Sequence, residues 1–277
     1  MRGSGLALKL VSMFPVALYA RIWLAQIRYS TVREMMFKSN FILWVIVDLT
    51  WFGLQLSFVR FLYLQVDVIA GWGKWEMVLL VTTNMVVQQV FQMLLMINLT
   101  KLPELIRTGK LDFFLAQPAS AQFLVSTRNF EPGSVVNTLA ALVVCAIAVA
   151  HLQKPVSLAG LAVYPLLVGF GVLIHYSLLT ILMSLAFWMT RANGFINAYY
   201  NVFQIARLPR EAFSGLTRFA FTWAVPLLLI ANVPARTLLY GLNASDLLAM
   251  GLVTAVLVAL STLVFQAGLR RYGSASS

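Results

Sequence analysis

The chain has 277 residues, of which 61% are hydrophobic and only 10% are charged. Soluble domains carry about 25% charged residues, so this composition excludes a soluble globular protein and indicates an integral membrane protein. Cys145 is the single cysteine, which excludes an internal disulfide and a cysteine-based metal cluster. The net charge is +11, but the twenty Lys and Arg residues lie between apolar runs, a distribution typical of membrane topology and not of nucleic-acid binding.

The N-terminal region is mixed apolar and basic. Residues 14–39 predict an interfacial helix that leads into the first span, with Trp23 and Tyr29 as interfacial anchors, although the amphipathic pattern is imperfect. A signal peptide is the less favoured interpretation of the first twenty residues, because Pro15 interrupts the apolar run and the next segment is basic.

Six apolar segments predict an all-α integral membrane protein with six transmembrane helices, at 41–59, 77–97, 134–150, 158–190, 219–233 and 247–267. The first has nineteen residues, enough to cross a hydrocarbon core of about 30 Å. The fourth has no charged residue over 33 positions, which predicts one long tilted helix in which Gly169 and Gly171 permit close packing or a bend. Asp246 is the expected N-cap of the last helix.

The fifth apolar segment, 219–233, has only fifteen residues and contains Pro226. We therefore expect a half-helix that breaks near Pro226 and continues into a re-entrant element through Asn232 and Pro234. Non-helical backbone at membrane depth must be shielded by protein or line a cavity. The preceding stretch, 191–218, carries four arginines and predicts a second cytoplasmic segment.

Polar side chains inside the spans have two open interpretations. Asp48 lies within the first span, and Asn84, Gln88 and Gln92 follow one another at i, i+4 and i+8 on one face of the second span. They either join neighbouring helices by hydrogen bonds or line a translocation path. His175 has no metal-ligand neighbours in the sequence, which favours a packed, hydrogen-bonded histidine over a metal ligand.

The longest polar interruption of the apolar pattern is the loop 99–131. Within it Pro103 suits the first turn of a helix and Gly109 suits its end, so Pro103 to Thr108 predicts a short helix. A helix of two turns is not stable alone in water, since isolated helices need roughly 12 to 15 residues. The short helix must therefore pack against something else.

The distribution of basic residues favours a cytoplasmic location for this loop and for both chain termini. Six crossings with the N-terminus inside leave sixteen Lys and Arg residues on the inner side. The outer side then holds four, which are Arg60, Lys74, Lys154 and Arg236.

Motifs for several chemistries are missing from the sequence. It contains no GxxxxGK[ST] phosphate-binding loop, no HExxH and no GxSxG, and no cluster of aspartates that would hold Mg²⁺. We therefore expect neither a membrane enzyme nor a cofactor bound by this chain.

Four groups of residues follow one another at characteristic places. The loop contains Gly109, Leu111, Asp112, Leu115, Pro118 and Ser120. Phe187 and Trp188 end the fourth span, Leu208 precedes Pro209, and the run VPLLLIANVPARTLLYG follows at 225–241. With two spans before the loop and four after it, this order resembles the membrane subunits of bacterial ABC-2-type exporters from about Arg21 to Arg271. Leu208 departs from the family's pattern, which has an aromatic residue before this proline, and affects local packing at that turn.

The resemblance implies a permease in the bacterial plasma membrane without its own motor. It would pair with a second permease copy or a close paralogue, and with separate cytoplasmic ABC ATPase subunits that bind ATP and magnesium. The short helix would be a coupling helix seated in a groove of the ATPase, with Leu105 and Ile106 as apolar anchors and Glu104, Arg107 and Lys110 as a polar rim. The full set implied for this contact is Leu102, Pro103, Glu104, Leu105, Ile106, Arg107, Thr108, Gly109, Lys110 and Asp112.

Two other functions stay open from the sequence. An ion-coupled secondary transporter would use Asp48 as its proton or cation site, and a non-transporting membrane anchor would need none of the polar residues in the spans. For a transporter, the apolar composition suits a hydrophobic or amphipathic substrate better than a highly charged one.

Overall fold

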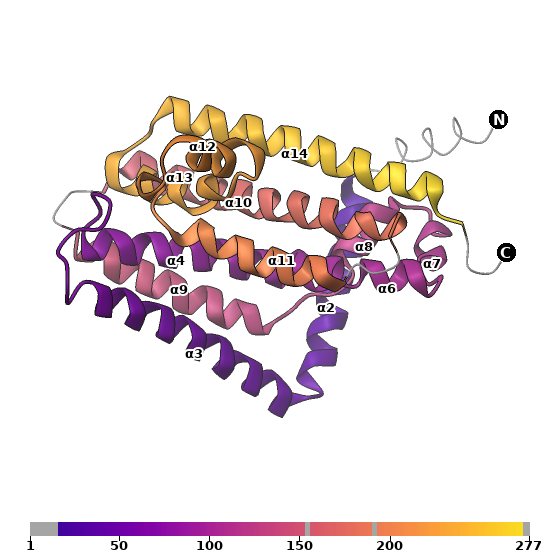
Figure 1. Ribbon diagram of the computed structural model, residues 1–277. Helices are drawn as coiled ribbons and strands as arrows, with labels where there is room; N and C mark the ends of the chain where they lie inside the picture. Colours follow the sequence, from indigo (N-terminus) through magenta and orange to yellow (C-terminus); the bar gives the residue numbers. More distant parts are fainter. Residues whose placement is uncertain (1–15, 153–155, 190–192, 274–277) are drawn as a thin grey trace.

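The computed structural model describes residues 16–152, 156–189 and 193–273, which are almost entirely helical, with no strand in these ranges (Figure 1). Arg2, Lys9, Lys154 and Arg191 lie outside the described residues. The elements in chain order are α2 (Val16–Met35), α3 (Lys38–Leu62), α4 (Lys74–Phe91), η1 (Gln92–Met96), α5 (Ile97–Leu99), α6 (Leu102–Arg107), α7 (Asp112–Leu115), α8 (Ala121–Thr127), α9 (Gly133–Ala150), α10 (Leu158–Ser184), η2 (Leu185–Phe187), α11 (Asn193–Phe203), η3 (Gln204–Arg207), η4 (Arg210–Ala212), α12 (Gly215–Phe219), η5 (Ala220–Ala224), α13 (Leu227–Tyr240) and α14 (Ala244–Arg271).

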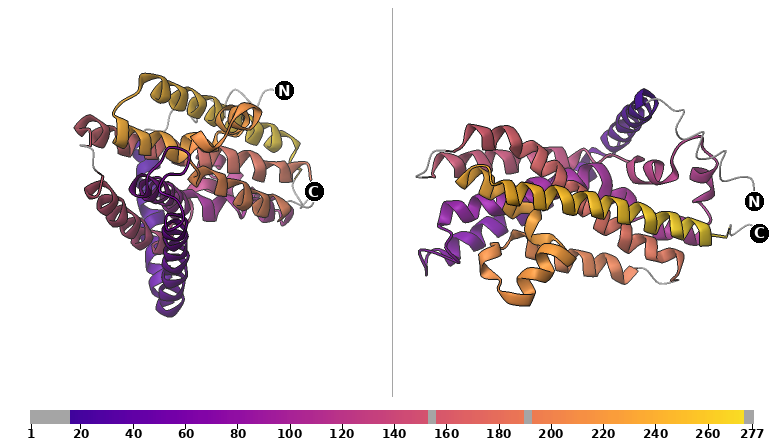
Figure 2. Two further views of the ribbon diagram at one scale, coloured as in Figure 1. Left: turned by 60° about the vertical axis from the view of Figure 1, so that its left-hand side comes forward. Right: turned by 90° about the horizontal axis from the view of Figure 1, so that it is seen from above.

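The long helices form one bundle with two distinct ends. We call the end that carries α6, α7, α8 and the C-terminus of α14 the α6–α8 end, and the other the opposite end (Figure 1). Helix α2 leaves the bundle at a steep angle near the α6–α8 end, and α3 begins directly after it (Figure 2). This arrangement suits a helix that lies along a membrane surface before the chain enters the membrane.

Five helices are long and apolar enough to cross a membrane, with bounds Lys38–Leu62, Lys74–Arg107, Gly133–Ala150, Leu158–Phe187 and Ala244–Arg271. They contain the predicted segments 41–59, 77–97, 134–150 and 247–267 and most of 158–190. The last helix begins one turn earlier than expected. Its N-cap is Asn243, whose Oδ1 accepts the backbone N–H groups of Ser245 and Asp246, so the prediction of Asp246 as the cap is wrong.

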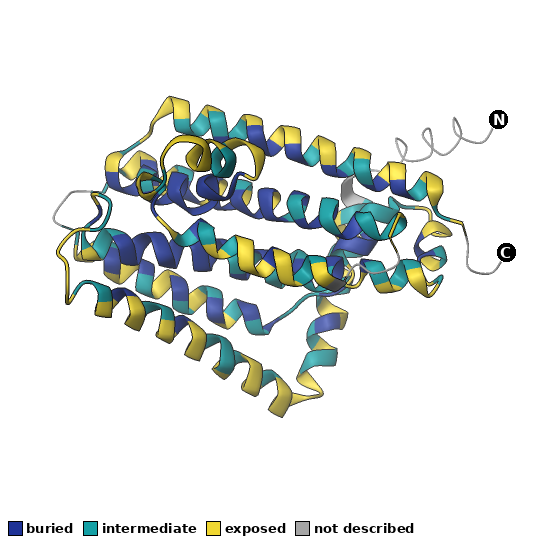
Figure 3. Ribbon diagram, in the orientation of Figure 1, coloured by how far each residue is buried: buried dark blue, intermediate teal, exposed yellow. Residues whose placement is uncertain are grey.

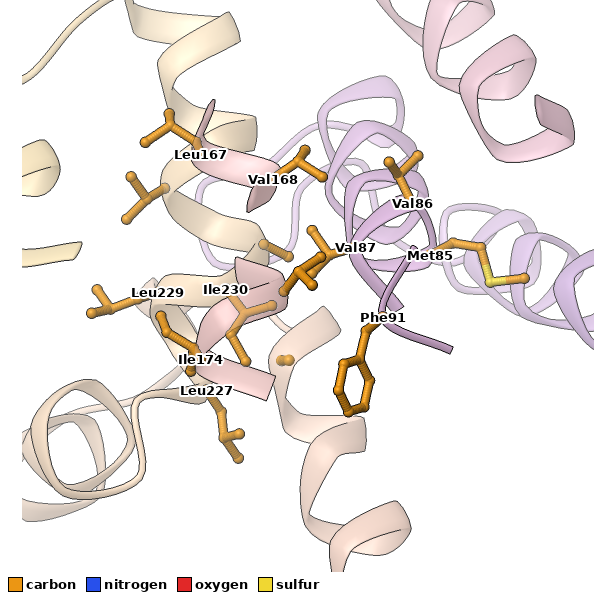
Figure 4. Packing of buried hydrophobic residues seen from close by; sticks show 14 of the residues in the cluster. Met85, Val86, Val87, Phe91, Leu167, Val168, Ile174, Leu227, Leu229 and Ile230 are labelled. Carbon is orange, nitrogen blue, oxygen red and sulfur yellow. The ribbon is translucent and has the colours of Figure 1, made fainter. Parts of the chain in front are cut away.

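The centre of the bundle is formed by α4, α10 and α13, which are buried over most of their lengths (Figure 3). Val87 and Phe91 of α4 lie beside Ile174 of α10 and Ile230 of α13 in a continuous apolar core (Figure 4). Helix α3 is the opposite case, because half of its apolar side chains are exposed in the single chain and only Phe52 and Val59 are buried. Lipid or another protein chain must cover that surface in a membrane.

The prediction that residues 191–218 form one cytoplasmic segment is wrong for most of this length. Helix α11 and η3 pack against α10, α4 and α13, and residue Arg210 reaches Asp246 at the opposite end of the bundle. Residues 193–207 thus bring the chain back from the α6–α8 end, where α10 finishes. Sequence reasoning missed this passage because α11 is short and amphipathic: Tyr199 is buried, while Asn197 and Asn201 are exposed.

The predicted span 219–233 is not a straight crossing. The pair Gly215–Ala224 and Leu227–Tyr240 bends by 88° at the break, which contains Pro226 as expected. Both arms return to the opposite end, so the pair is re-entrant. Asn232 and Pro234 do not form its irregular part, since both lie within helix α13.

These corrections change the distribution of basic residues. Arg207, Arg210 and Arg218 move from the predicted inner side to the opposite half of the bundle. Among the described residues, ten Lys and Arg therefore lie toward the α6–α8 end and six toward the opposite end. The prediction for the same sixteen residues is thirteen to three, so the bias keeps its direction but is weaker.

Gly171 makes a closer helix contact than Gly169, although both were expected to permit packing. A Cβ at Gly171 would lie 2.9 Å from Cγ1 of Val87 and 3.2 Å from the carbonyl oxygen of Ile230, whereas a Cβ at Gly169 would meet nothing within 4 Å. Alanine is otherwise favoured over glycine in a helix by about 1 kcal/mol.

We expect Gly171→Ala to lower the free energy of unfolding by about 1 to 3 kcal/mol through overpacking. Gly169→Ala should leave it unchanged or raise it. Thermal unfolding of the two purified variants in detergent measures the difference, and equal melting temperatures would contradict the packing of α10 on α4 and α13.

Candidate functional site

The candidate site is the loop between α5 and α9, which folds into a compact platform at the α6–α8 end. Helix α6 starts with Pro103 in its first turn, and Gly109 adopts a φ of +72°, a value that favours glycine. The backbone N–H of Leu111 then bonds back to the carbonyl of Leu105 at 3.1 Å. Leu102 and Leu111 are fully buried, so α6 and the turn after it are held against the bundle.

The exposed apolar side chains of the platform differ from those predicted. Leu105 and Ile106 are half-buried and pack against the core, so they are only partly available to another protein. In α7, by contrast, Phe113 is 74% exposed and Leu115 is 43% exposed, while Phe114 points inward at 5%. A phenylalanine outside the membrane and three-quarters exposed is a candidate docking residue that sequence reasoning missed.

The three residues predicted to form a polar rim lie on the surface. Glu104, Arg107 and Lys110 are all exposed. The sequence DFFL at 112–115 does not distinguish Phe113 from Phe114, and only the packing of the platform turns Phe113 outward and Phe114 inward.

Helix α8 ties the platform to the bundle and to α2. The amide of Gln122 donates to Tyr176 Oη of α10 at 2.9 Å, and Ser126 Oγ donates to the same oxygen at 3.3 Å. On the other side Tyr19 of α2 accepts the backbone N–H of Ser120, and its ring meets Phe123 edge-on with centroids 4.9 Å apart. The platform is therefore in direct contact with both α10 and α2.

Two buried asparagines close the base of the loop. Asn98 Oδ1 accepts the backbone N–H of Asn129 at 2.8 Å and its side-chain amide at 2.9 Å, while Asn98 Nδ2 donates to the carbonyl of Asn129 at 2.8 Å. Arg33 of α2 adds a bond to Asn129 Oδ1 at 3.0 Å. We call this pair the asparagine clamp. It joins the ends of a 30-residue excursion through groups that are almost fully buried.

A π-helical turn next to the clamp also fixes the base of the loop. Residues Gln92–Met96 form the turn, and a π-turn frees carbonyl groups from the regular ladder. The carbonyl of Met93 accepts the backbone N–H of Glu131 at 3.0 Å, just before α9 begins. The chain thus enters α9 from a position defined by two independent sets of hydrogen bonds.

Glu131 itself is partly buried at this boundary. Burial raises the pKa of its carboxyl group to about 7, and the nearby negative charges of Asp48 and Glu34 act in the same direction. A hydrogen bond with Gln92 and the charge of Lys101 oppose this shift without cancelling it. Glu131 therefore changes its charge near neutral pH, next to the base of the platform.

The polar residues predicted for the spans do not converge on one path in the single chain. Asp48 accepts a hydrogen bond from Asn137 Nδ2 of α9 at 2.9 Å, which joins α3 to α9. Asn84 and Gln88 instead face α10 and α11 across a cavity of only about 10 Å³, too small for any substrate. Gln92 forms a hydrogen bond with Glu131. The three amides predicted on one face of the second span are therefore in two different environments.

His175 lines the small cavity and is packed, as the sequence favoured. Its Nδ1 lies 2.8 Å from Tyr199 Oη, and its ring stacks on Phe91 and Phe203. No group of three or more His, Cys, Asp or Glu residues that could hold a metal ion occurs within the described ranges.

At the opposite end, an ion-pair network connects four elements. Arg210 contacts Asp246 at 2.8 Å and Glu211 at 3.2 Å, and Arg236 contacts both acids. Trp72 Nε1 of the α3–α4 loop donates to Glu211 at 2.8 Å. Burial opposes ionisation of Glu211, but the bond from Trp72 and the two arginines outweigh it, so the pKa of Glu211 lies below its ordinary value.

Asn232 supports this network from within α13. Its Oδ1 accepts the backbone N–H of Arg210 at 2.8 Å, and its Nδ2 donates to the carbonyl of Leu208 at 3.0 Å. A fully buried side chain thereby pairs the non-helical backbone between η3 and η4. This pairing meets the requirement that irregular backbone in a membrane be shielded by protein.

We expect Asn98→Leu to loosen the platform, because the isosteric leucine leaves backbone groups of Asn129 buried without partners at a cost of about 1 to 3 kcal/mol each. The measurement is hydrogen–deuterium exchange over residues 102–127, which should accelerate by tenfold or more, roughly in line with that cost. Asn40→Leu, at an exposed position of α3, is the matched control. Unchanged exchange in Asn98→Leu would show that the clamp does not hold the loop.

The Glu131 pKa predicts a pH dependence of stability. The folded state favours the protonated carboxyl and binds more protons than the unfolded chain between about pH 4.5 and 7, so the free energy of unfolding should fall as pH rises through that window. Glu131→Gln should remove this decrease, as judged by melting temperatures from pH 4.5 to 8. The exposed Glu104→Gln variant should keep it, and an unchanged profile in Glu131→Gln would assign the dependence to another group.

The comparisons with known proteins give one family. A family model described as ABC-2 family transporter protein matches residues 49–276, which is most of the chain. No curated protein and no solved structure matches the sequence.

Proposed function

Because the chain belongs to the ABC-2 family of transporter proteins, and is therefore a multi-pass membrane permease component of an ABC transporter, we propose that it works as an exporter driven by a separate ATPase subunit. The observation that carries the proposal is the platform, an exposed aromatic residue on a short helix that is clamped to the bundle. The chain has no phosphate-binding loop of its own. ATP and Mg²⁺ would bind only to the partner.

In this proposal the ATPase seats on α6 and α7. Phe113 would enter an apolar groove of the partner, and Glu104, Arg107 and Lys110 would form the surrounding polar rim. Closure of two ATPase subunits would then move the two platforms of a permease dimer. Rigid-body transmission needs a stiff contact, which the asparagine clamp and the bonds to Tyr176 support.

The proposed orientation places the α6–α8 end in the cytoplasm of a bacterium, in its plasma membrane. Ten of the sixteen described basic residues lie toward that end. Two of the six at the other end, Arg210 and Arg236, are paired with Glu211 and Asp246. The excess of Lys and Arg toward the α6–α8 end has the direction of the positive-inside rule.

A second permease copy is supported by an uncovered polar face. Asn197, Asn201 and Gln204 are exposed on α11 and η3 at i, i+4 and i+7, within the part of the chain that passes through the bundle. Such a stripe is unfavourable against lipid. A second copy placed against α11 would enclose it, and the translocation path would then lie between the two chains.

The deciding experiment is co-purification of the permease with its ATPase after substitution of Phe113. We expect Phe113→Asp to abolish co-purification and substrate-stimulated ATP hydrolysis while the permease remains inserted and monodisperse. Leu64→Asp is the matched control, because Leu64 is 70% exposed in the α3–α4 loop at the opposite end. Leu105→Asp should also uncouple the complex, but it places a charge on a partly buried residue, so its folding must be checked separately.

Normal coupling in Phe113→Asp would overturn the proposed docking mode. Transport that persists in ATP-free vesicles under an ion gradient, and is lost in Asp48→Asn, would instead identify an ion-coupled transporter.

A further inference from the structure

An apolar cavity lies in the opposite half of the bundle, between α3 and η3. It has a volume of about 410 Å³, within the range of roughly 300 to 1,000 Å³ that small-molecule sites occupy. Trp51, Leu54 and Phe58 of α3 form one wall, and Gln204, Arg207 and Pro209 belong to the other. The wall on α3 runs from Trp51 to Leu62, a separation of eleven residues or about 16 Å along the helix.

Arg207 is the single charged residue of this lining. It is half-buried and, within the described residues, makes no ion pair or hydrogen bond. The neighbouring arginines differ in this respect, since Arg210 and Arg236 share Glu211 and Asp246. Glu211 is already occupied by these two arginines and Trp72, so the closest acidic group in sequence is not free for Arg207.

An unpaired guanidinium beside an apolar wall is a costly arrangement in a membrane protein. A carboxylate or phosphate offers the guanidinium a bidentate partner, and the same molecule can cover the apolar wall only if an alkyl chain follows its acidic group. Arg207 ends η3, and Trp51 lies about three helical turns before Leu62 at the end of α3. A headgroup on Arg207 and a tail along the α3 wall would therefore satisfy the charge and the apolar surface together.

We propose that this cavity binds an amphiphile with an acidic headgroup and an alkyl tail, the headgroup on Arg207 and the tail along α3 toward Trp51. The inference names a substrate class for the permease and to that extent rests on the proposed function. The molecule is either a lipid of the bilayer or a free single-chain acid, which share this chemistry.

The test uses the quenching of tryptophan fluorescence by bromine. The full chain is placed in phosphatidylcholine nanodiscs, without any ATPase, and titrated with a fatty acid brominated on its tail or with the matched brominated fatty alcohol. We expect saturable quenching by the acid, binding of the alcohol that is weaker by about tenfold or more, and loss of the saturable component in Trp51→Phe.

The charge contact is tested with two arginine variants. Arg207→Gln should weaken binding of the acid by about tenfold or more and leave that of the alcohol unchanged. Arg218→Gln, an exposed arginine of α12 outside the cavity lining, should bind both as the unmodified chain does. Melting temperature and gel filtration of each variant exclude unfolding as the cause.

A competition experiment distinguishes a bilayer lipid from a free single-chain acid as the bound amphiphile. Displacement of the acid by phosphatidylglycerol in the nanodisc identifies a bilayer lipid, whereas its persistence identifies a free single-chain acid. Two results overturn the proposal. The first is the absence of saturable quenching, which is expected if a second permease copy fills the cavity. The second is equal affinity for the acid and the alcohol. Because no ATPase is present, failure here is independent of failure of the proposed coupling in Phe113→Asp.

Discussion

The asparagine clamp is the interaction on which the rest of the α6–α8 end depends. Asn98 and Asn129 exchange three hydrogen bonds where neither water nor other side chains can replace them, because both residues are almost fully buried. Buried polar groups that are fully paired define one arrangement, since any other leaves them unsatisfied. The clamp therefore turns a 30-residue loop into a rigid platform, and a rigid platform is what the transmission of mechanical work from another protein requires.

At the opposite end, paired charged side chains define the arrangement in the way that paired amides do at the α6–α8 end. Glu211 receives bonds from Trp72, Arg210 and Arg236, and Asp246 shares the two arginines, so the loop before α4, the re-entrant pair and α14 meet in one network. Partly buried ion pairs add less to stability than their number suggests, because desolvation offsets the attraction. Their effect here is positional: they hold the segment after η3 in place and leave Arg207 as an unpaired cation beside an apolar cavity.

Between these ends, the uncovered surfaces of the single chain follow from its membrane environment. Half of the apolar side chains of α3 are exposed, and α11 presents an amide-rich face. Lipid covers the first kind of surface without cost, but not the second. The second copy that we propose would cover the amide-rich face of α11, and Gln204 belongs both to that face and to the lining of the apolar cavity.

The sequence by itself determined the membrane class, the long apolar helices, the proline break at Pro226 and the short helix with Pro103 and Gly109, since each depends on composition or on residues close together in the chain. Tertiary structure alone decided that residues 193–207 pass back through the bundle, that Leu105 is partly covered while Phe113 is exposed, and that Arg207 lacks the partners that Arg210 has. These outcomes depend on pairs such as Asn98 with Asn129 and Arg210 with Asp246, which are far apart in sequence. Hydropathy and periodicity describe one helix at a time, whereas burial and charge pairing are properties of the packed bundle.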